Sequence, residues 1–296
     1  MAGNSGLAAE AVRPGRQHHD RLAEDFHMRR CLIAGLVASM AFVIAAPALS
    51  LAQTWDSAGL PPSAFQPSPT PPAPAPRRDL TGIWDAGNAG ISGPGHVASP
   101  FTPWAEERLK EMKPGNGPRA VHETEINDPL NTLCDPAGFP RTVLYELRPT
   151  QIVQTPNQVL ILYLYERRWR VIWTDGRELP KDPDPRWYGY SVGRWEDDFT
   201  FVVQTIGMDE RTWLDNAGNP HSSDLRVEER YQRVDRDWLE LTVTIDDPQA
   251  YTKPWTPRNR LRLKQMPPDT DLREWICAAS EAAAYRDVVA EQNKGK

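Results

Sequence analysis

A succession of short runs rich in aromatic and β-branched residues, separated by turn-forming pairs such as Pro-Asn, Asp-Gly and Asp-Asp, fills residues 142–266. No helical periodicity intervenes, so the runs predict antiparallel hairpins in sequence order. About eight such strands predict a mainly β domain, either an up-and-down, lipocalin-like barrel or a two-sheet sandwich, with short N- and C-terminal helices at 103–112 and 278–292. The expected strands are 79–84, 152–154, 158–165, 169–174, 188–195, 199–206, 225–234, 238–245 and 260–266.

Strand parity in 225–245 places two polar side chains on an inward face. Residues 239, 241, 243 and 245 are aliphatic and alternate with polar ones, which defines the inside of that strand. The preceding strand must turn Glu229 and Tyr231 toward the same core. A buried carboxylate needs a partner, and burial raises its pKa toward the range useful for proton transfer. Glu229 is therefore either paired with an arginine, such as Arg233 or Arg170, or a catalytic acid or base.

The loop before that strand supplies further candidate catalytic groups. His221 is the only histidine between residues 159 and 251, and it suits general acid or base chemistry near neutral pH. We predict that Asp215 holds the His221 tautomer and that Tyr231 donates a hydrogen bond to a substrate oxygen. The alternative is that His221 only caps the next strand. We predict no metal site, because no histidine or cysteine pair has ligand spacing.

Aromatic residues are dense between 163 and 255, and many are ordinary sheet residues. A closed eight-stranded barrel, however, has room inside for one small ligand. Rings that line such a space favour an apolar or aromatic guest. The predicted ligand-binding residues are Trp169, Trp173, Tyr188, Tyr190, Trp213, Tyr251 and Trp255.

The N-terminal sequence predicts export. Residues 28–52 carry two arginines, an apolar run and a small-residue cleavage site, which is typical of a signal peptide, and residues 1–27 are expected to be an extension of the gene call. An uncut membrane anchor is the alternative, but the apolar run is shorter than the roughly 20 residues that a span needs. Residues 53–78 are proline-rich and predict a disordered linker before a single β domain at 79–296. We expect a periplasmic or secreted protein with no stable membrane span after cleavage.

Two cysteines remain after the signal peptide, Cys134 and Cys277. An even pair in an oxidising compartment predicts a disulfide, worth on the order of 4 kcal/mol by the loop-entropy argument. The whole chain has 34 basic and 40 acidic residues, of which residues 1–52 hold 5 and 4, which leaves 29 against 36. This acidic balance, without a basic stripe, argues against nucleic-acid binding. No feature indicates an oligomeric state.

Several motifs resemble those of a widespread group of exported bacterial proteins. They are GYSVGRWE, TWLDNAGNPHS, ERYQR and TIDDPQAYTKPW, with DLTGIW, PFTPW and CDPAGFPR before them. The likeness covers residues 79–277. It implies an exported β domain, and because the group has no established activity it supplies no catalytic residues.

These features together predict an exported enzyme that acts on an apolar or aromatic small molecule by acid and base chemistry, as a lyase, isomerase or hydrolase. No phosphate loop, dinucleotide fingerprint or haem motif is present, so we predict no organic cofactor. The alternative is a lipocalin-like carrier with the same pocket and no turnover. A third reading is a structural envelope module without an internal cavity.

Overall fold

The computed structural model describes residues 60, 62–66, 68, 70–91, 100–145 and 147–293, all within one compact unit, Ser57–Lys296. The predicted gene-call extension 1–27 and signal peptide 28–52 lie outside the described residues. The described part of the chain contains no helix that is both long enough and apolar enough to cross a membrane.

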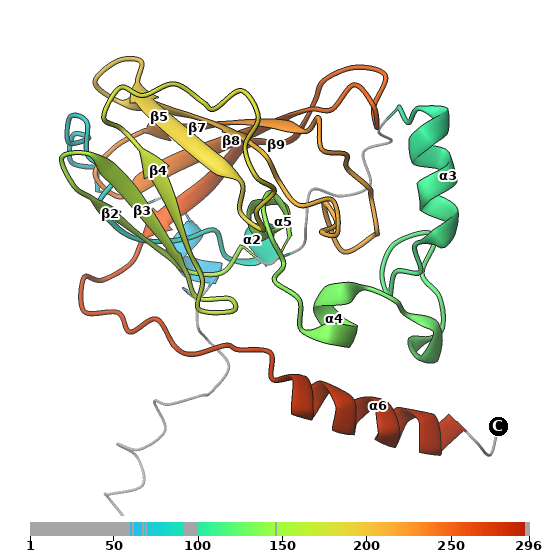
Figure 1. Ribbon diagram of the computed structural model, residues 1–296. Coiled ribbons are helices and arrows are strands. Elements are labelled where there is room, and N and C mark those ends of the chain that lie inside the picture. Colours follow the sequence, from blue (N-terminus) through green and yellow to red (C-terminus); the bar gives the residue numbers. More distant parts are fainter. Residues whose placement is uncertain are drawn as a thin grey trace, which may run out of the picture. The chain divides into compact units, whose positions relative to one another are not determined.

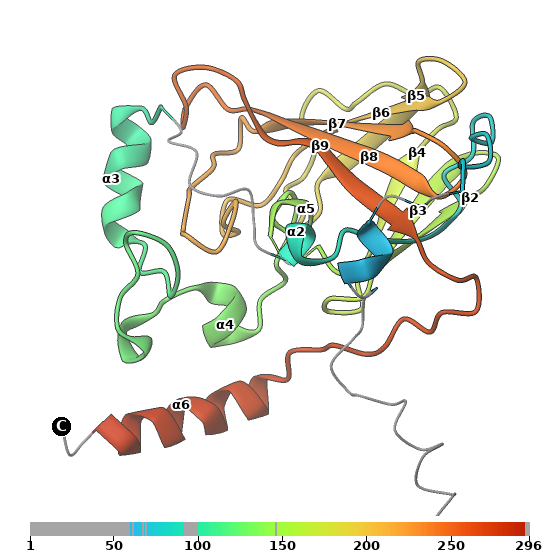
Figure 2. The same ribbon diagram turned by 180° about the vertical axis from the view of Figure 1, so that it is seen from behind.

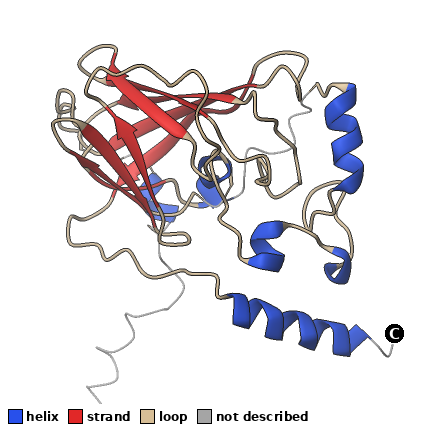
Figure 3. Cartoon of the chain, in the orientation of Figure 1, coloured by secondary structure: helices blue, strands red, loops and turns tan. Residues whose placement is uncertain are grey.

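Nine strands form one closed barrel in which neighbours in sequence are neighbours in space (Figures 1 and 3). Of the two predicted architectures the barrel is confirmed, and its nine strands correspond to the short strand expected at 79–84 and the eight expected after it. The antiparallel pair of β1 and β9 closes the barrel. The strands are β1 (Gly82–Asp85), β2 (Thr150–Gln154), β3 (Gln158–Tyr163), β4 (Trp169–Trp173), β5 (Tyr190–Trp195), β6 (Thr200–Ile206), β7 (Arg226–Arg233), β8 (Trp238–Asp246) and β9 (Trp255–Gln265).

One pair of strands differs from the antiparallel expectation. β4 and β5 are parallel, and only Ile172↔Ser191 and Trp173↔Val192 are in register between them. The connection 174–189 is not a hairpin turn; it contains three prolines and carries the chain back before β5 begins. Proline cannot donate to a sheet ladder, so this return path stays outside the sheet. The ladder between β4 and β5 is short because the chain reaches β5 only after this return path.

The helices are short and are not part of the barrel sheet. Thr102 caps α3 (Pro103–Glu111) by accepting from the Ala105 N–H at 3.3 Å, and Pro103 occupies the first turn, where a missing N–H costs nothing. The predicted helices 103–112 and 278–292 correspond to α3 and α6 (Ala279–Asn293). The other described helices are η2 (Pro62–Phe65), α2 (Asn88–Ile91), η3 (Glu123–Glu125), α4 (Pro129–Leu133) and α5 (Arg141–Leu144).

Alternating side chains fill the barrel interior. The four aliphatic residues of β8 predicted to face inward are fully buried, and Glu229 and Tyr231 of β7 are buried opposite them. Burial of each large aliphatic side chain contributes roughly 1.5–3 kcal/mol, so this face supplies much of the driving force for closure. The β8 residues are Leu239, Leu241, Val243 and Ile245.

The proline-rich segment before β1 packs on the barrel, and we call its described residues between 60 and 78 the strap. The Leu60 N–H donates to Asp85 Oδ2 at 2.6 Å, and the Arg236 N–H donates to Ala73 O at 2.9 Å. The η2 helix within the strap lies beside the end of β9 (Figure 2). The described residues of the strap thus differ from the predicted disordered linker, because its apolar side chains, Leu60 and Phe65, pack against the barrel.

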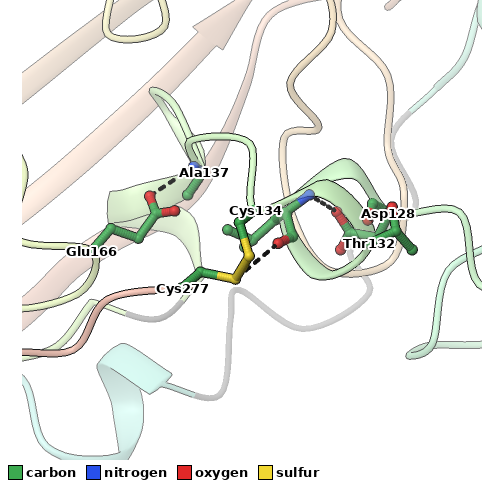
Figure 4. The surroundings of a disulfide bond; sticks show 7 residues. Asp128, Thr132, Cys134, Ala137, Glu166 and Cys277 are labelled. Carbon is green, nitrogen blue, oxygen red and sulfur yellow. Dashed lines mark hydrogen bonds between the residues drawn. A yellow bond between two sulfur atoms is a disulfide. The ribbon is translucent and has the colours of Figure 1, made fainter. Parts of the chain in front are cut away.

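The disulfide joins the two ends of the folded domain (Figure 4). Cys134 ends α4 in the left-handed conformation, with φ at 55°, and its N–H donates to Pro129 O. Cys277 precedes α6, 143 residues later in the sequence. The predicted pairing of Cys134 with Cys277 is therefore present, and it fastens the segment after β9 to α4.

Candidate functional site

A buried ion pair inside the barrel joins β4 to β7. Arg170 donates from Nη1 to Glu229 Oε1 at 3.1 Å, and its Nη2 donates to Glu229 Oε2. The same guanidinium donates from Nε to Ser191 Oγ of β5 at 3.0 Å and from Nη2 to Thr205 Oγ1 of β6 at 3.1 Å. One side chain therefore links four consecutive strands across the parallel β4–β5 seam.

Tyr231 completes this network and fixes its charge state. Its hydroxyl donates to Glu229 Oε1 at 2.7 Å. Burial, with the Glu229 charge as the next cause, raises the pKa of Tyr231 well above 10.0, so the phenol stays a neutral donor. Burial alone would lower the pKa of Arg170, but the charge and hydrogen bonds of Glu229, together with the neighbouring Tyr163 and Tyr231, outweigh this effect, and the pKa lies above the usual value. Both Glu229 oxygens are thus engaged by permanent donors.

Aromatic rings pack beside the ion pair. The Phe139 ring lies with its centroid 3.8 Å from Arg170 Cζ, and the rings of Tyr163 and Tyr188 stack with centroids 6.2 Å apart. Burial raises the pKa of both phenols. Of the predicted ligand-binding residues, Tyr188 is therefore the one packed beside this interior cluster.

His221 lies in a separate cluster with different partners. Its Nδ1 is 3.1 Å from Ser222 O, and because a carbonyl only accepts, Nδ1 carries the hydrogen. Its Nε2 is 2.7 Å from Thr212 Oγ1. Burial lowers the pKa of His221, which favours the neutral ring. We predicted Asp215 as the orienting group, and the structure corrects this to Thr212 and Ser222.

Asp215 instead holds its own loop. Its Oδ1 accepts from the N–H groups of Ala217 at 2.9 Å and Asn219 at 3.3 Å, and its Oδ2 accepts from Asn219 Nδ2 at 2.6 Å. Aspartate side chains commonly bond to the backbone two residues on, which offers a nearer partner than a histidine six residues away. Asp215 is therefore a turn-forming residue here.

The four predicted catalytic residues form two groups. Glu229 and Tyr231 meet inside the barrel, as strand parity predicted. Within the described residues, no hydrogen bond or ion pair connects either of them with His221 or Asp215. In the described part of the chain, the four residues therefore do not form one hydrogen-bonded cluster.

The predicted aromatic ligand site is divided as well. Trp169 and Trp173 alternate with the inward Arg170 and Ile172, so they face outward, and Trp169 is 66% exposed. Tyr190 accepts from Arg177 Nη1 at 3.1 Å in an exposed contact. A one-residue shift of parity separates the inside of a barrel from its outside, and dense aromatic content alone does not reveal which side each ring takes.

The remaining three rings stabilise loops. The Tyr251 hydroxyl donates to Pro220 O at 2.8 Å, and its ring packs against Trp255 at 5.4 Å between centroids. Trp213 is buried, with its ring 5.9 Å from Arg141 Cζ. These contacts lock the 212–224 loop to the 246–255 loop, so the three residues have packing partners within the protein.

Sequence reasoning missed a groove on the outer face of the barrel, beside the strap. It has a volume of about 510 Å³, and we call it the Trp238 groove. In β8, Trp238 alternates with the inward residues and so lies on the same outer face as Glu240 and Thr242. A large apolar ring on an outer face is the sequence feature that could have indicated this groove. Its apolar lining consists of Leu60, Pro62, Phe65, Ala86, Ala89, Trp238 and Leu261.

Cations and rings gather around Trp238. The Phe65 ring meets it edge-on at 5.9 Å between centroids, with an interplanar angle of 62°. Arg262 Cζ lies 4.0 Å and Lys264 Nζ 4.9 Å from the Trp238 ring centroid. The groove can therefore offer an apolar wall, an aromatic face and positive charge to one ligand.

Among the described residues, no group of three or more histidine, cysteine, aspartate or glutamate side chains is placed to hold a metal ion. No protein-family model matches the chain, and searches of the curated proteins and of the solved structures found no match either.

Proposed function

We propose that this protein binds an apolar or aromatic small molecule in the Trp238 groove and acts as a carrier rather than as an enzyme. The observation that carries the proposal is the groove itself: about 510 Å³, walled by apolar side chains and by the rings of Phe65 and Trp238. Pockets for small ligands commonly have volumes of 300–1,000 Å³ and mostly apolar walls with a few polar groups.

The hydrogen bonds of the predicted catalytic residues support binding over acid and base chemistry. Glu229 is fully buried and already accepts three hydrogen bonds, two from Arg170 and one from Tyr231, which hold its carboxylate within the barrel interior. A general base must reach the proton that it removes. His221 is buried against Thr212 and Ser222 in another cluster, which leaves Glu229 without a catalytic partner.

We propose further that the protein works in the periplasm or is secreted. The sequence of residues 28–52 supports this, and so does the Cys134–Cys277 bond, since disulfides persist in oxidising compartments. A carrier in such a compartment suits apolar molecules that need a sheltered surface in water.

Fluorescence titration with N-phenyl-1-naphthylamine, an uncharged aromatic dye, tests the groove. We expect saturable binding that weakens about tenfold in Phe65→Ala, because the variant removes one aromatic wall. Phe199→Ala is the matched control, since Phe199 is 39% exposed and is not among the groove residues. Equal binding by the two variants would place the dye elsewhere and defeat the proposal.

A second measurement separates a carrier from an enzyme. The purified protein is incubated with a metabolite extract, and bound and free molecules are identified by mass spectrometry. A carrier returns its ligand chemically unchanged. Time-dependent loss of a bound compound with appearance of a product, abolished by Glu229→Gln or His221→Gln in folded protein, would instead establish the enzyme reading.

A further inference from the structure

We propose that the Trp238 groove selects anionic ligands: an apolar or aromatic body that carries a carboxylate or a similar acidic group, bound by Arg262. This inference rests on the proposed function and adds the chemical class of the ligand and the residue that sets it.

The sheet register places two cations beside the aromatic wall. Trp238 is directly opposite Lys264 on β9, and Glu240 is opposite Arg262. Directly opposite and diagonal side chains on one face of an antiparallel pair lie within reach of one another. Arg262 accordingly lies over the Trp238 ring, with Cζ 4.0 Å from the centroid, and Arg262 also lines the groove.

The nearby carboxylates already have partners. Glu240, the residue opposite Arg262, accepts from Arg260 Nε at 2.6 Å. Asp237 pairs with Arg236 at 2.9 Å. Within the described residues, no ion pair connects Arg262 or Lys264 to a carboxylate. The groove thus presents positive charge that the barrel leaves unneutralised.

The position of Arg262 makes this charge selective. A guanidinium stacked on an indole keeps its N–H edge free to donate, and it binds planar acidic groups through two parallel hydrogen bonds. The apolar wall beside it removes water from one side, which strengthens the interaction with an anion. A cationic ligand would be repelled by Arg262, which lines the groove without a paired carboxylate among the described residues.

Two dyes with the same ring system test this selectivity. 8-Anilinonaphthalene-1-sulfonate differs from N-phenyl-1-naphthylamine by one sulfonate group, so the pair isolates the contribution of the charge. Dissociation constants for both are measured by fluorescence titration of the folded full chain, with near-UV circular dichroism confirming that each variant keeps its native packing.

We expect Arg262→Gln to weaken binding of the sulfonate dye at least tenfold and to change binding of the uncharged dye less than twofold. Arg262→Lys, which keeps the charge, should retain affinity for the sulfonate dye within about threefold. Arg177→Gln is the matched control: Arg177 also stacks on a tryptophan, with Cζ 3.6 Å from the Trp173 centroid, but it is not a groove residue.

Three outcomes would overturn the inference. If Arg262→Gln weakens both dyes equally, Arg262 contributes packing and not anion recognition, while the groove remains a binding site. If Arg177→Gln has the same effect as Arg262→Gln, the sulfonate responds to overall charge. If the uncharged dye does not bind the unmodified protein or ignores Phe65→Ala, the proposed function itself fails.

Discussion

Replacement of Glu229 by glutamine tests whether the interior ion pair is a structural clamp. The side chains of Arg170 and Glu229 are 1% and 0% exposed, and among the described residues Glu229 is the only carboxylate that forms an ion pair with Arg170. Glu229→Gln keeps the size of the side chain and removes the charge. Arg170 would then be a buried cation whose counter-charge is lost.

Removal of one partner of a buried ion pair typically costs about 3–5 kcal/mol, because the remaining charge stays desolvated. Glutamine retains one carbonyl that can accept from Arg170 or Tyr231, so we expect about 3 kcal/mol, the lower end of that range. Folded domains are stable by roughly 5–15 kcal/mol, so the variant should still fold in the absence of denaturant.

The assay is urea unfolding followed by circular dichroism, with the slope of the transition compared between variants. Arg170→Met should also destabilise the protein. The double variant should cost less than the sum of the two single variants by about 2 kcal/mol, within the range of roughly 0.5–3 kcal/mol that is usual for residues in contact. Glu196→Gln is the matched control: it removes the partner of Arg230, an exposed pair on the outside of β7. That change should cost no more than about 1 kcal/mol.

The reasoning would be refuted if Glu229→Gln unfolded at the same urea concentration as the unmodified protein, or if its cost equalled that of Glu196→Gln. Either result would mean that Arg170 reaches water or another counter-charge when Glu229 is neutral.

Two further predictions concern the loop and the strap. Burial lowers the pKa of His221 below 6.5, so the unfolded state binds the proton more tightly, and stability that is present above pH 6.5 is lost as the pH falls. The urea midpoint of His221→Gln should therefore drop less between pH 7 and pH 5 than that of the unmodified protein. An equal drop in the two proteins would contradict this prediction. A Cβ at Gly87 would lie 2.9 Å from the Phe65 ring, whereas one at Gly176 meets nothing within 4 Å, and both glycines have positive φ. Gly87→Ala should therefore expose the strap to limited proteolysis and Gly176→Ala should not; equal cleavage would show that Phe65 does not hold the strap.

Strand parity predicted the interior correctly where both partners are regular strands. The pattern of β7 and β8 placed Glu229 and Tyr231 inside, and Arg170 was one of the two arginines named as a partner. Side chains alternate strictly along a strand, so a residue number fixes a face. The sequence could not choose between Arg170 and Arg233, because that choice depends on how the barrel closes.

Irregular backbone limited the rest of the prediction. β9 begins at Trp255 and not at 260, because Pro257 is accommodated where the register with β8 shifts between Leu241 and Ile245. Proline inside a strand usually argues against the strand, and bulges are the exception. The conformation of the 212–224 loop could not be predicted either, because a residue distant in sequence holds it. Asp247, 25 residues after Ser222, accepts hydrogen bonds from the Ser222 N–H and from Ser222 Oγ, each at 2.7 Å.

The parallel seam gives a physical reason for ligand binding to lie outside the barrel. Only two residue pairs join β4 to β5, and Arg170 reinforces that junction from inside by donating to β5, β6 and β7 at once. Any interior ligand that drew Glu229 away would leave Arg170 uncompensated and weaken this short seam. The side chains of Trp238 and Arg262 on the outer face of β8 and β9 contact each other and take no part in the hydrogen bonds of Arg170 with Ser191, Thr205 and Glu229. A groove there can exchange ligands while the closed sheet stays intact.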